Sequence, residues 1–299
     1  MTKFRNLIEY LLLKSVAAFL MSFPLDYSLK IAGFIADIAF LLPNRFSKRG
    51  MRHLRMVYPD KSLEELNQIL RRALRHFAMV FVEILSLPSK VHANSYTKYV
   101  TVKGTQYLDE GLKKGHGVIM VAAHFGNWEL AGPPLRIMGY PVNAVARFMP
   151  NARVDALLNR SRLYLGEKVI YKENAIKDMM KALKKNELLA IVADQDARDG
   201  GIFVDFLGIP SSTTRSPALL NIRFGSPLVM LTCYRSEKDK FKYVLEFSPC
   251  PISTNLEDVA QITQAFANEL TKTIHQHPEQ WMWFHRRWKS TPAFPSRKA

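Results

Sequence analysis

The sequence has few cysteines and lacks the common motifs for nucleotides, metals and serine nucleophiles. Its 299 residues include only Cys233 and Cys250, which form no CxxC motif and no paired spacing. We therefore expect neither a disulfide framework nor a zinc cage, and a reducing, cytosol-facing compartment is the simpler interpretation. GxSxG, P-loop and HExxH motifs are missing, and His275 and His277 have no ligand partners at metal spacing. The sequence thus predicts no metal and no bound cofactor.

A clean membrane-spanning run is also missing. A spanning helix needs about 20 mostly apolar residues, but residues 7–23 contain Glu9 and Lys14, and residues 31–42 contain Asp37. No convincing signal-peptide cleavage site follows the first run. The basic stretch "RFSKRGMRHLR", residues 45–55, favours anionic headgroups on the cytoplasmic side. We expect residues 1–95 to be helical and to lie on or dip into a membrane, with two ordinary buried helices as the alternative.

Positive charge is in excess, which limits the classes of partner. Lysine and arginine number 42 against 26 acidic residues, giving a net charge of +16. Such a chain is attracted to nucleic acid, to anionic lipid or to an acidic protein, and charge alone does not choose among them. No helix-turn-helix, zinc finger or RNP-type aromatic block is visible, so we do not expect nucleic acid as a partner.

Two regions of different hydrophobic periodicity follow one another. Up to about residue 95 apolar residues recur every three or four positions, and Ser62 with Glu65 predicts a capping box. From about residue 99, strand-like runs alternate with helix-period stretches, and a last helix is expected to start near Asn255. The strand-like runs are 99–104, 117–124, 142–147, 168–171, 188–194, 201–208, 227–235 and 242–249. The pattern predicts a helical region, 1–95, and an α/β domain, 96–299, with a mixed, largely parallel sheet flanked by helices.

A histidine ends the second strand-like run, and a glutamate follows five positions later in "HFGNWE", residues 124–129. On one continuous helix His124 and Glu129 would lie about 140° apart and could not face each other. A helix that starts near Asn127 would let Glu129 swing back toward the imidazole, where a carboxylate fixes the tautomer and raises the basicity of the other nitrogen. The free N–H groups of that helix could steady an oxyanion. The pair therefore suits deprotonation of a hydroxyl that attacks an acyl carbon; the alternative is a buried histidine and an incidental helix-dipole acid.

Three aspartates follow another strand-like run in "ADQDARDGG". A calcium loop would need an acid or amide at position 198, where the sequence has Arg198, so a metal site is disfavoured. Orientation of a polar substrate or of nearby arginines is the favoured role, and a solvated turn is the alternative. The aspartates are Asp194, Asp196 and Asp199.

Aromatic residues surround two arginines in "PEQWMWFHRRWK", residues 278–289. Such a pattern suits a phosphate-bearing amphiphile at a membrane interface or stacked nucleotides. In the alternative interpretation the tryptophans belong to the core and the arginines to the surface. The residues concerned are Trp281, Trp283, Phe284, Arg286, Arg287 and Trp288.

Three ordered blocks resemble the late acyltransferases of lipid A biosynthesis, of the lauroyl and myristoyl type, within the lysophospholipid acyltransferase superfamily. "HFGNWE" resembles the HX4(D/E) box, and "ADQDARDGGIFVDFLGIPSSTT" resembles the acidic block that continues to phenylalanine, glycine and threonine. "PEQWMWFHRRWK" resembles the C-terminal signature, and "NRSRLYLG" matches the region of a substrate-binding arginine, best placed at Arg162. The resemblance covers about residues 5–290.

The resemblance implies a glycerolphosphate-acyltransferase-like fold and an O-acyltransferase that works without metal. The acyl chain would move from acyl carrier protein to a hydroxyl, or a hydroxyacyl chain, of a phosphorylated lipid A precursor in lipopolysaccharide or lipooligosaccharide biosynthesis. The site would be the cytoplasmic face of the inner membrane, against its anionic surface. The implied general base is His124, oriented by Glu129, and the implied substrate-contacting or supporting residues are Arg162, Asp194, Asn127 and Arg286.

Two other functions stay open. The closest is acylation of a different glycolipid, such as a phosphatidylinositol mannoside, possibly from acyl coenzyme A. A non-catalytic lipid-binding protein is the other, although a binder has no need of a base such as His124.

Overall fold

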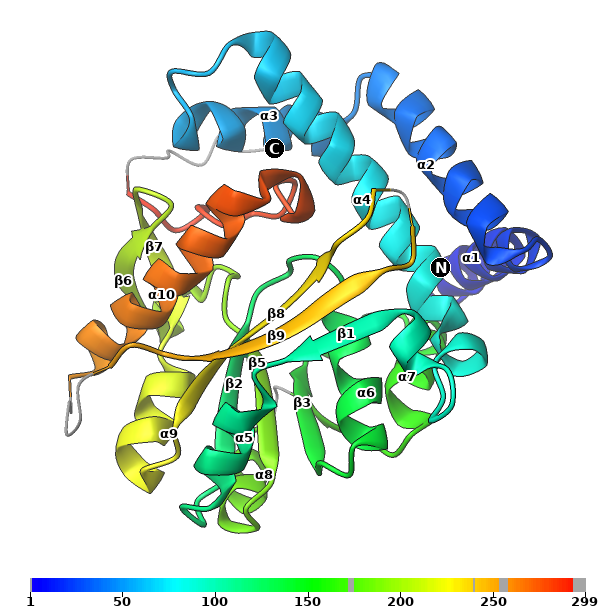
Figure 1. The fold of residues 1–299 in the computed structure, drawn as a ribbon. Helices are drawn as coiled ribbons and strands as arrows, with labels where there is room; N and C mark the ends of the chain where they lie inside the picture. Colours follow the sequence, from blue (N-terminus) through cyan, green and yellow to red (C-terminus); the bar gives the residue numbers. More distant parts are fainter. Residues whose placement is uncertain (1, 172–174, 239, 253–257, 293–299) are drawn as a thin grey trace.

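The computed structural model describes residues 2–171, 175–238, 240–252 and 258–292 (Figure 1). A helical N-terminal part precedes a domain in which strands and helices alternate. The helices are α1 (Thr2–Met21), α2 (Leu25–Leu41), α3 (Arg45–Val57), α4 (Leu63–Lys90), α5 (Thr105–Leu112), α6 (Gly132–Ile137), α7 (Ala152–Leu163), α8 (Ala175–Lys184), α9 (Ser216–Phe224) and α10 (Val259–Gln276). The strands are β1 (Val100–Lys103), β2 (Val118–Ala122), β3 (Val142–Ala146), β4 (Lys168–Tyr171), β5 (Leu188–Val192), β6 (Gly201–Phe206), β7 (Ile209–Thr214), β8 (Leu228–Arg235) and β9 (Tyr243–Pro249).

The main sheet confirms the prediction of a mixed, largely parallel sheet flanked by helices. Its order is β1-β9-β8-β2-β5-β3-β4, with β8, β2, β5, β3 and β4 mutually parallel. Strand β9 pairs antiparallel with β8 and parallel with β1, which makes the sheet mixed. Because helices cover both faces, the strands at its centre can be apolar throughout.

Strand β2 shows this covering directly. All five of its residues are buried. Ile119 and Val121 belong to one apolar core, whereas Met120 and Ala122 belong to the core on the opposite face. The alternation places the end of β2, and the histidine that follows it, between two packed layers.

Helices α4 and α10 both begin at a residue whose side chain caps the first backbone N–H groups. Ser62 Oγ accepts from the Glu65 backbone N–H, and the Glu65 carboxylate accepts from the Ser62 N–H, which confirms the predicted capping box. Helix α10 begins after Asp258, whose side chain accepts from the N–H groups of Ala260 and Gln261. The predicted start near Asn255 lies outside the described residues.

Strand β7 was not expected, because "IPSSTT" contains proline and short polar residues that favour turns. It forms an antiparallel hairpin with β6, beside α10 in Figure 1. The reversal uses Leu207 and Gly208, both with positive φ (57° and 77°), as a tight hairpin turn requires. Helices α5 and α6 were not anticipated either.

Helices α1 and α2 lie at one edge of the molecule, next to α4 (Figure 1). In the part of the chain that the structure describes, no helix combines the length and apolarity that a membrane crossing requires. Helix α4 packs against α2, α3 and α7, so it joins the N-terminal helices to the α/β part.

Candidate active site

The register of two neighbouring strands brings a histidine and an aspartate together. Ala122 at the end of β2 pairs with Val192 at the end of β5. His124 and Asp194 each follow two positions later, at the carboxyl ends of parallel strands where α/β proteins place their ligand sites. His124 Nδ1 lies 2.7 Å from Asp194 Oδ1, and the His124 backbone N–H donates to Asp194 Oδ2 at 2.9 Å.

Asp194 is buried, with 2% of its surface exposed, yet it remains a carboxylate. Burial by itself would raise the pKa of Asp194, but the attraction and hydrogen bond of His124 outweigh this and hold that pKa well below its usual value. Trp281 Nε1 donates to Asp194 Oδ2 at 2.8 Å. Since a carboxylate only accepts, His124 Nδ1 carries the proton in this pair and Nε2 is left as the basic nitrogen.

The basic nitrogen of His124 lies beside an amide and two aromatic rings. Gln195 Nε2 lies 3.1 Å from His124 Nε2. The Trp128 ring meets the imidazole edge-on at a centroid distance of 4.9 Å, and His285 stacks nearly parallel to it at 6.4 Å. Burial lowers the pKa of His285 to about 4, so this second imidazole is neutral at neutral pH. His285 and Gln195 were missed, although both lie inside blocks that the sequence singled out.

Glu129 does not contact the imidazole, which corrects the sequence-based expectation. A helical turn does begin where predicted, because η2 (Trp128–Ala131) is capped by Asn127. The turn directs Glu129 toward α7, where its carboxylate accepts from Arg162 Nε at 2.7 Å and from Arg162 Nη2. Trp128 Nε1 also donates to Glu129, at 3.1 Å. The carboxylate that orients His124 is therefore Asp194.

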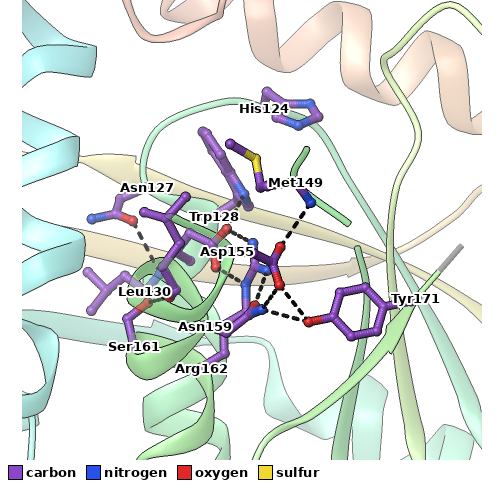
Figure 2. Close-up of polar contacts among 12 residues, drawn as sticks. His124, Asn127, Trp128, Leu130, Met149, Asp155, Asn159, Ser161, Arg162 and Tyr171 are labelled. Atoms are coloured by element: carbon purple, nitrogen blue, oxygen red, sulfur yellow. Dashed lines mark hydrogen bonds and ion pairs between the residues drawn. The ribbon is translucent and has the colours of Figure 1, made fainter. Parts of the chain in front are cut away.

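Arg162 also belongs to a polar network with Asn159, Asp155 and Tyr171 (Figure 2). Arg162 Nη1 donates to Asn159 at 2.8 Å, and Asn159 donates to Asp155 at 2.8 Å. Tyr171 OH also donates to Asp155, at 2.8 Å. Burial alone would lower the pKa of Arg162, but the charge and hydrogen bonds of the Glu129 carboxylate outweigh this and hold that pKa above its usual value. The guanidinium is thus a fixed cation held by the protein, and its contact with substrate stays a prediction.

Asn127 links the same turn to α4 through hydrogen bonds of its side-chain amide. Its side chain accepts from the Leu130 N–H at 3.2 Å and donates to Glu83 at 3.1 Å. Glu83 is fully buried and also accepts from Arg235 Nη1 at 2.7 Å and Tyr243 OH at 2.6 Å. Both ends of the Asn127 amide are used within the protein, and its role toward substrate stays a prediction. The missed signal was a glutamate inside the apolar run "AMVFVEIL".

The C-terminal block is mainly a packing element. Its tryptophans Trp281, Trp283 and Trp288 are buried, as in the alternative interpretation. Arg287 is also buried and donates to the Ser212 carbonyl at 2.6 Å and to Thr213 Oγ1, so the expectation of a surface position was wrong for this residue. The buried rings offer no platform for stacked nucleotides.

Two other residues from the sequence blocks, Arg286 and Asp196, differ in their surroundings. Arg286 is exposed and stays a candidate for a phosphate contact. Asp196 accepts from the N–H groups of Arg198 and Ser290 at 2.8 Å and 2.7 Å. Across the described ranges, no cluster of three histidine, cysteine, aspartate or glutamate side chains is arranged to hold a metal ion.

A pocket extends from Trp128 along one face of the sheet. Its walls are mostly apolar, and several are small: Ala122, Ala131, Gly132, Ala144, Ala146 and Ala190 line it. Glu129, Arg162 and Glu167 supply its charged groups. An apolar pocket that starts at Trp128, the ring packed against His124, can hold an alkyl chain close to a reacting carbonyl.

An α/β fold with a histidine–aspartate pair at the strand ends, near an apolar pocket, is compatible with an enzyme that moves acyl groups. The sequence model of the family described as "Bacterial lipid A biosynthesis acyltransferase" matches residues 1–290. The chain belongs to this family, and the resemblance predicted from its sequence blocks is confirmed.

Individual relatives agree with the family and show its breadth. A lipid A biosynthesis acyltransferase of Haemophilus influenzae is 29% identical over 246 residues, which are 81% of this chain and 76% of the relative. A phosphatidylinositol mannoside acyltransferase of Mycobacterium tuberculosis is 26% identical over 222 residues, 72% of this chain and 69% of the relative. The crystal structure of the 1-acyl-sn-glycerophosphate acyltransferase PlsC from Thermotoga maritima is a distant likeness, with a TM-score of 0.36 and 13% identity over 85% of this chain and 99% of that one.

Proposed function

We propose that the protein transfers a fatty acyl chain from the thioester of acyl carrier protein to a hydroxyl of a phosphorylated lipid A precursor. Membership of the family supports acyl transfer in lipid A biosynthesis. The single observation that carries the chemistry is the hydrogen bond between His124 Nδ1 and Asp194, which leaves Nε2 as the basic nitrogen. The Trp128 ring that packs against His124 also lines the apolar pocket. The pocket would hold the acyl chain of the donor.

The proposed reaction uses His124 as base and then as acid. As the acceptor oxygen attacks the thioester carbonyl, its proton moves to His124 Nε2, and the resulting imidazolium is stabilised by Asp194. The tetrahedral intermediate then breaks its C–S bond, and Nε2 returns the proton to the departing sulfur. The products are the new ester and the free thiol of the carrier.

Glu129 is a positioning residue in this proposal. It accepts from Trp128 Nε1, and the Trp128 ring packs edge-on against His124, so the Glu129–Arg162 pair fixes the ring that confines the base. The N–H groups of Gly126 and Asn127 donate to the carbonyls of Gln280 and Cys233, which removes them as oxyanion donors. An oxyanion contact from this turn would therefore come from later N–H groups.

We also propose that the N-terminal helices dock on the anionic cytoplasmic surface of the inner membrane. Helices α1 and α2 expose large apolar side chains, among them Phe4, Leu12, Phe34 and Leu41, with 71%, 68%, 63% and 78% of their surface accessible. The next helix, α3, contains no acid and exposes Arg45, Lys48, Arg52 and Arg55. An apolar surface bordered by cations is the pattern of peripheral binding to anionic lipid.

Acyl transfer by the purified protein in detergent tests the activity. We expect wild type to add one chain to a tetra-acylated, phosphorylated lipid A precursor from acyl carrier protein, and His124→Ala to lose most of this activity while keeping its circular dichroism spectrum. Activity that survives in His124→Ala would refute the mechanism.

Donor and acceptor are separated in parallel reactions. Acyl coenzyme A replaces the carrier in one arm, and a phosphatidylinositol mannoside replaces the lipid A precursor in another. Faster transfer to the mannoside, or from coenzyme A, would replace the corresponding part of the proposal.

Membrane docking is tested by flotation with vesicles that contain anionic phospholipid. We expect Phe34→Asp together with Leu41→Asp to reduce binding severalfold. Ile176→Asp is the matched control, because Ile176 is 70% exposed but lies on α8, away from α1 and α2. Equal losses in both variants would contradict a docking role for α2.

A further inference from the structure

A buried carboxyl group without a partner lies in the wall of the pocket that starts at Trp128. Glu167 is 7% exposed, and its Oε2 has no hydrogen-bond partner among the residues that the structure describes. Such groups are rare in folded proteins because an unpaired buried polar atom costs free energy. Its presence in the lining of a pocket points to a ligand that supplies the missing bond.

The neighbouring polar groups are committed elsewhere. Arg162 donates to Glu129 and Asn159, and Arg136 donates to the carbonyls of Leu165 and Tyr140 at 3.1 Å and 2.9 Å. Gly132 lets the carboxyl approach the pocket wall, since a Cβ at that position would lie 2.1 Å from Glu167 Oε2. The sequence thus makes room for an acid and provides no side chain to pair it.

Strand register places this acid at the inner end of the pocket. Ala122 and Ala146 lie at the carboxyl ends of β2 and β3, the sheet edge at which His124 follows β2, whereas Val142 lies at the start of β3. Glu167 directly precedes Lys168, which pairs with Asn143, so its backbone is level with Val142. The four residue-to-residue steps from Val142 to Ala146 span about 13 Å. A chain whose carbonyl lies at His124 would meet Glu167 well beyond its first carbons.

The charges around the pocket select a neutral ligand group. A cationic group would face Arg162, and an anionic group would face Glu129. Burial and the Glu129 carboxylate raise the pKa of Glu167 to about 8, so at neutral pH this carboxyl keeps a proton and can both donate and accept. A hydroxyl has the same pair of capacities.

We propose that the pocket takes a fatty acyl chain that carries a hydroxyl group, and that Glu167 hydrogen-bonds this hydroxyl. The inference rests on the proposed function, because it takes the pocket to be the place of the acyl chain. It adds a substrate class: a chain hydroxylated beyond its first carbons in preference to a plain chain of equal length.

Equilibrium binding to the full chain tests this without relying on turnover. The ligands are acyl pantetheine amides of one chain length, in which an amide replaces the reactive thioester, with one hydroxyl at successive carbons or none. We expect wild type to bind some hydroxylated isomers about 3- to 10-fold more tightly than the plain chain, the range of one hydrogen bond. Glu167→Leu should reverse this preference, and Glu167→Gln should keep part of it.

Leu135→Met is the matched control, because Leu135 lines the same pocket and the change adds no hydrogen-bonding group comparable to a carboxyl. It should leave the ratio of hydroxylated to plain binding unchanged. The inference is overturned if wild type prefers no hydroxylated isomer, or if the preference persists in Glu167→Leu. Should Glu167→Leu fail to fold, loss or retention of the preference in Glu167→Gln decides.

The outcome is independent of the transfer assay. If the hydroxyl preference depends on Glu167 but no acyl chain is transferred, the proposed function fails and the pocket assignment stands. If transfer occurs and the preference is absent, the substrate class proposed here is wrong and the function stands.

Discussion

His124 Nδ1 and Asp194 Oδ1 lie 2.7 Å apart, although 70 positions separate the two residues in the chain. The bond unites two of the sequence blocks that resemble the family, because the first ends β2 and the second ends the adjacent β5. It makes Asp194 the residue that sets the protonation state of the proposed base.

Asp194→Asn should lower the rate of acyl transfer about 10²- to 10³-fold, with a smaller change in KM, because an amide cannot stabilise the imidazolium. Steady-state kinetics of the purified variant measure this. Asp196→Asn is the matched control, since Asp196 accepts only from backbone N–H groups in the described contacts. Full activity in Asp194→Asn would show that another group orients His124.

The contributions of Glu129 and Arg162 to the free energy of unfolding should be strongly coupled. Their side chains are 11% and 19% exposed, so removing one partner leaves a largely buried charge. We expect Glu129→Gln and Arg162→Met each to lower the free energy of unfolding by about 2–4 kcal/mol, and the double variant to cost less than the sum. Urea unfolding of the four proteins measures the coupling. The exposed pair Glu237–Lys240 is the control, and we expect no measurable coupling energy between its two residues. If the losses at Glu129 and Arg162 are additive, the two residues are not coupled and the prediction is wrong.

Glu83 should be essential to the position of the HFGNWE turn. Glu83→Gln removes the counter-charge of the buried Arg235 and disturbs the bond to Asn127, so we expect a loss of about 3 kcal/mol in unfolding free energy and reduced acyl transfer. Tyr243→Phe removes one hydrogen bond to the same carboxylate and should cost about 1 kcal/mol with activity retained. Chemical denaturation and kinetics of both variants provide the test. Equal losses in Glu83→Gln and Tyr243→Phe would show that the negative charge of Glu83 opposite Arg235 does not matter for stability.

Stability should depend on pH through Glu167. Because its pKa is raised from 4.5 to about 8, the folded protein keeps a proton between these values that the unfolded chain has released. Stability therefore falls as pH rises through this window, and Glu167→Gln removes that loss. The difference in unfolding free energy between Glu167→Gln and wild type should be about 3–4 kcal/mol more favourable to the variant at pH 8 than at pH 5.

Urea unfolding at the two pH values measures this difference. Glu110→Gln, at an exposed position, is the control and should show no such difference. A Glu167→Gln difference that is independent of pH would mean that the buried carboxyl titrates normally.

Local patterns predicted the elements well where their signals are local. The Ser62–Glu65 capping box and the buried β2 run both depend on neighbouring residues, and both are present. Strand β7 was missed because its polar residues carry no strand signal of their own. They are held by pairing with β6 and by Arg287, which donates to the Ser212 carbonyl from 75 positions away. The two candidate blocks at strand ends were found because polar residues there have no role in a simple turn.

The sequence by itself determined the class of fold, the family and the histidine at the end of β2, because periodicity and motif spacing are written along the chain. Only the tertiary structure decided which carboxylate meets that histidine. Glu129 is five positions away but faces Arg162, whereas Asp194 is brought to His124 by the register of β2 with β5. The same distinction holds for Glu167, whose lack of a partner depends on where Arg136, Arg162 and Gly132 lie after folding.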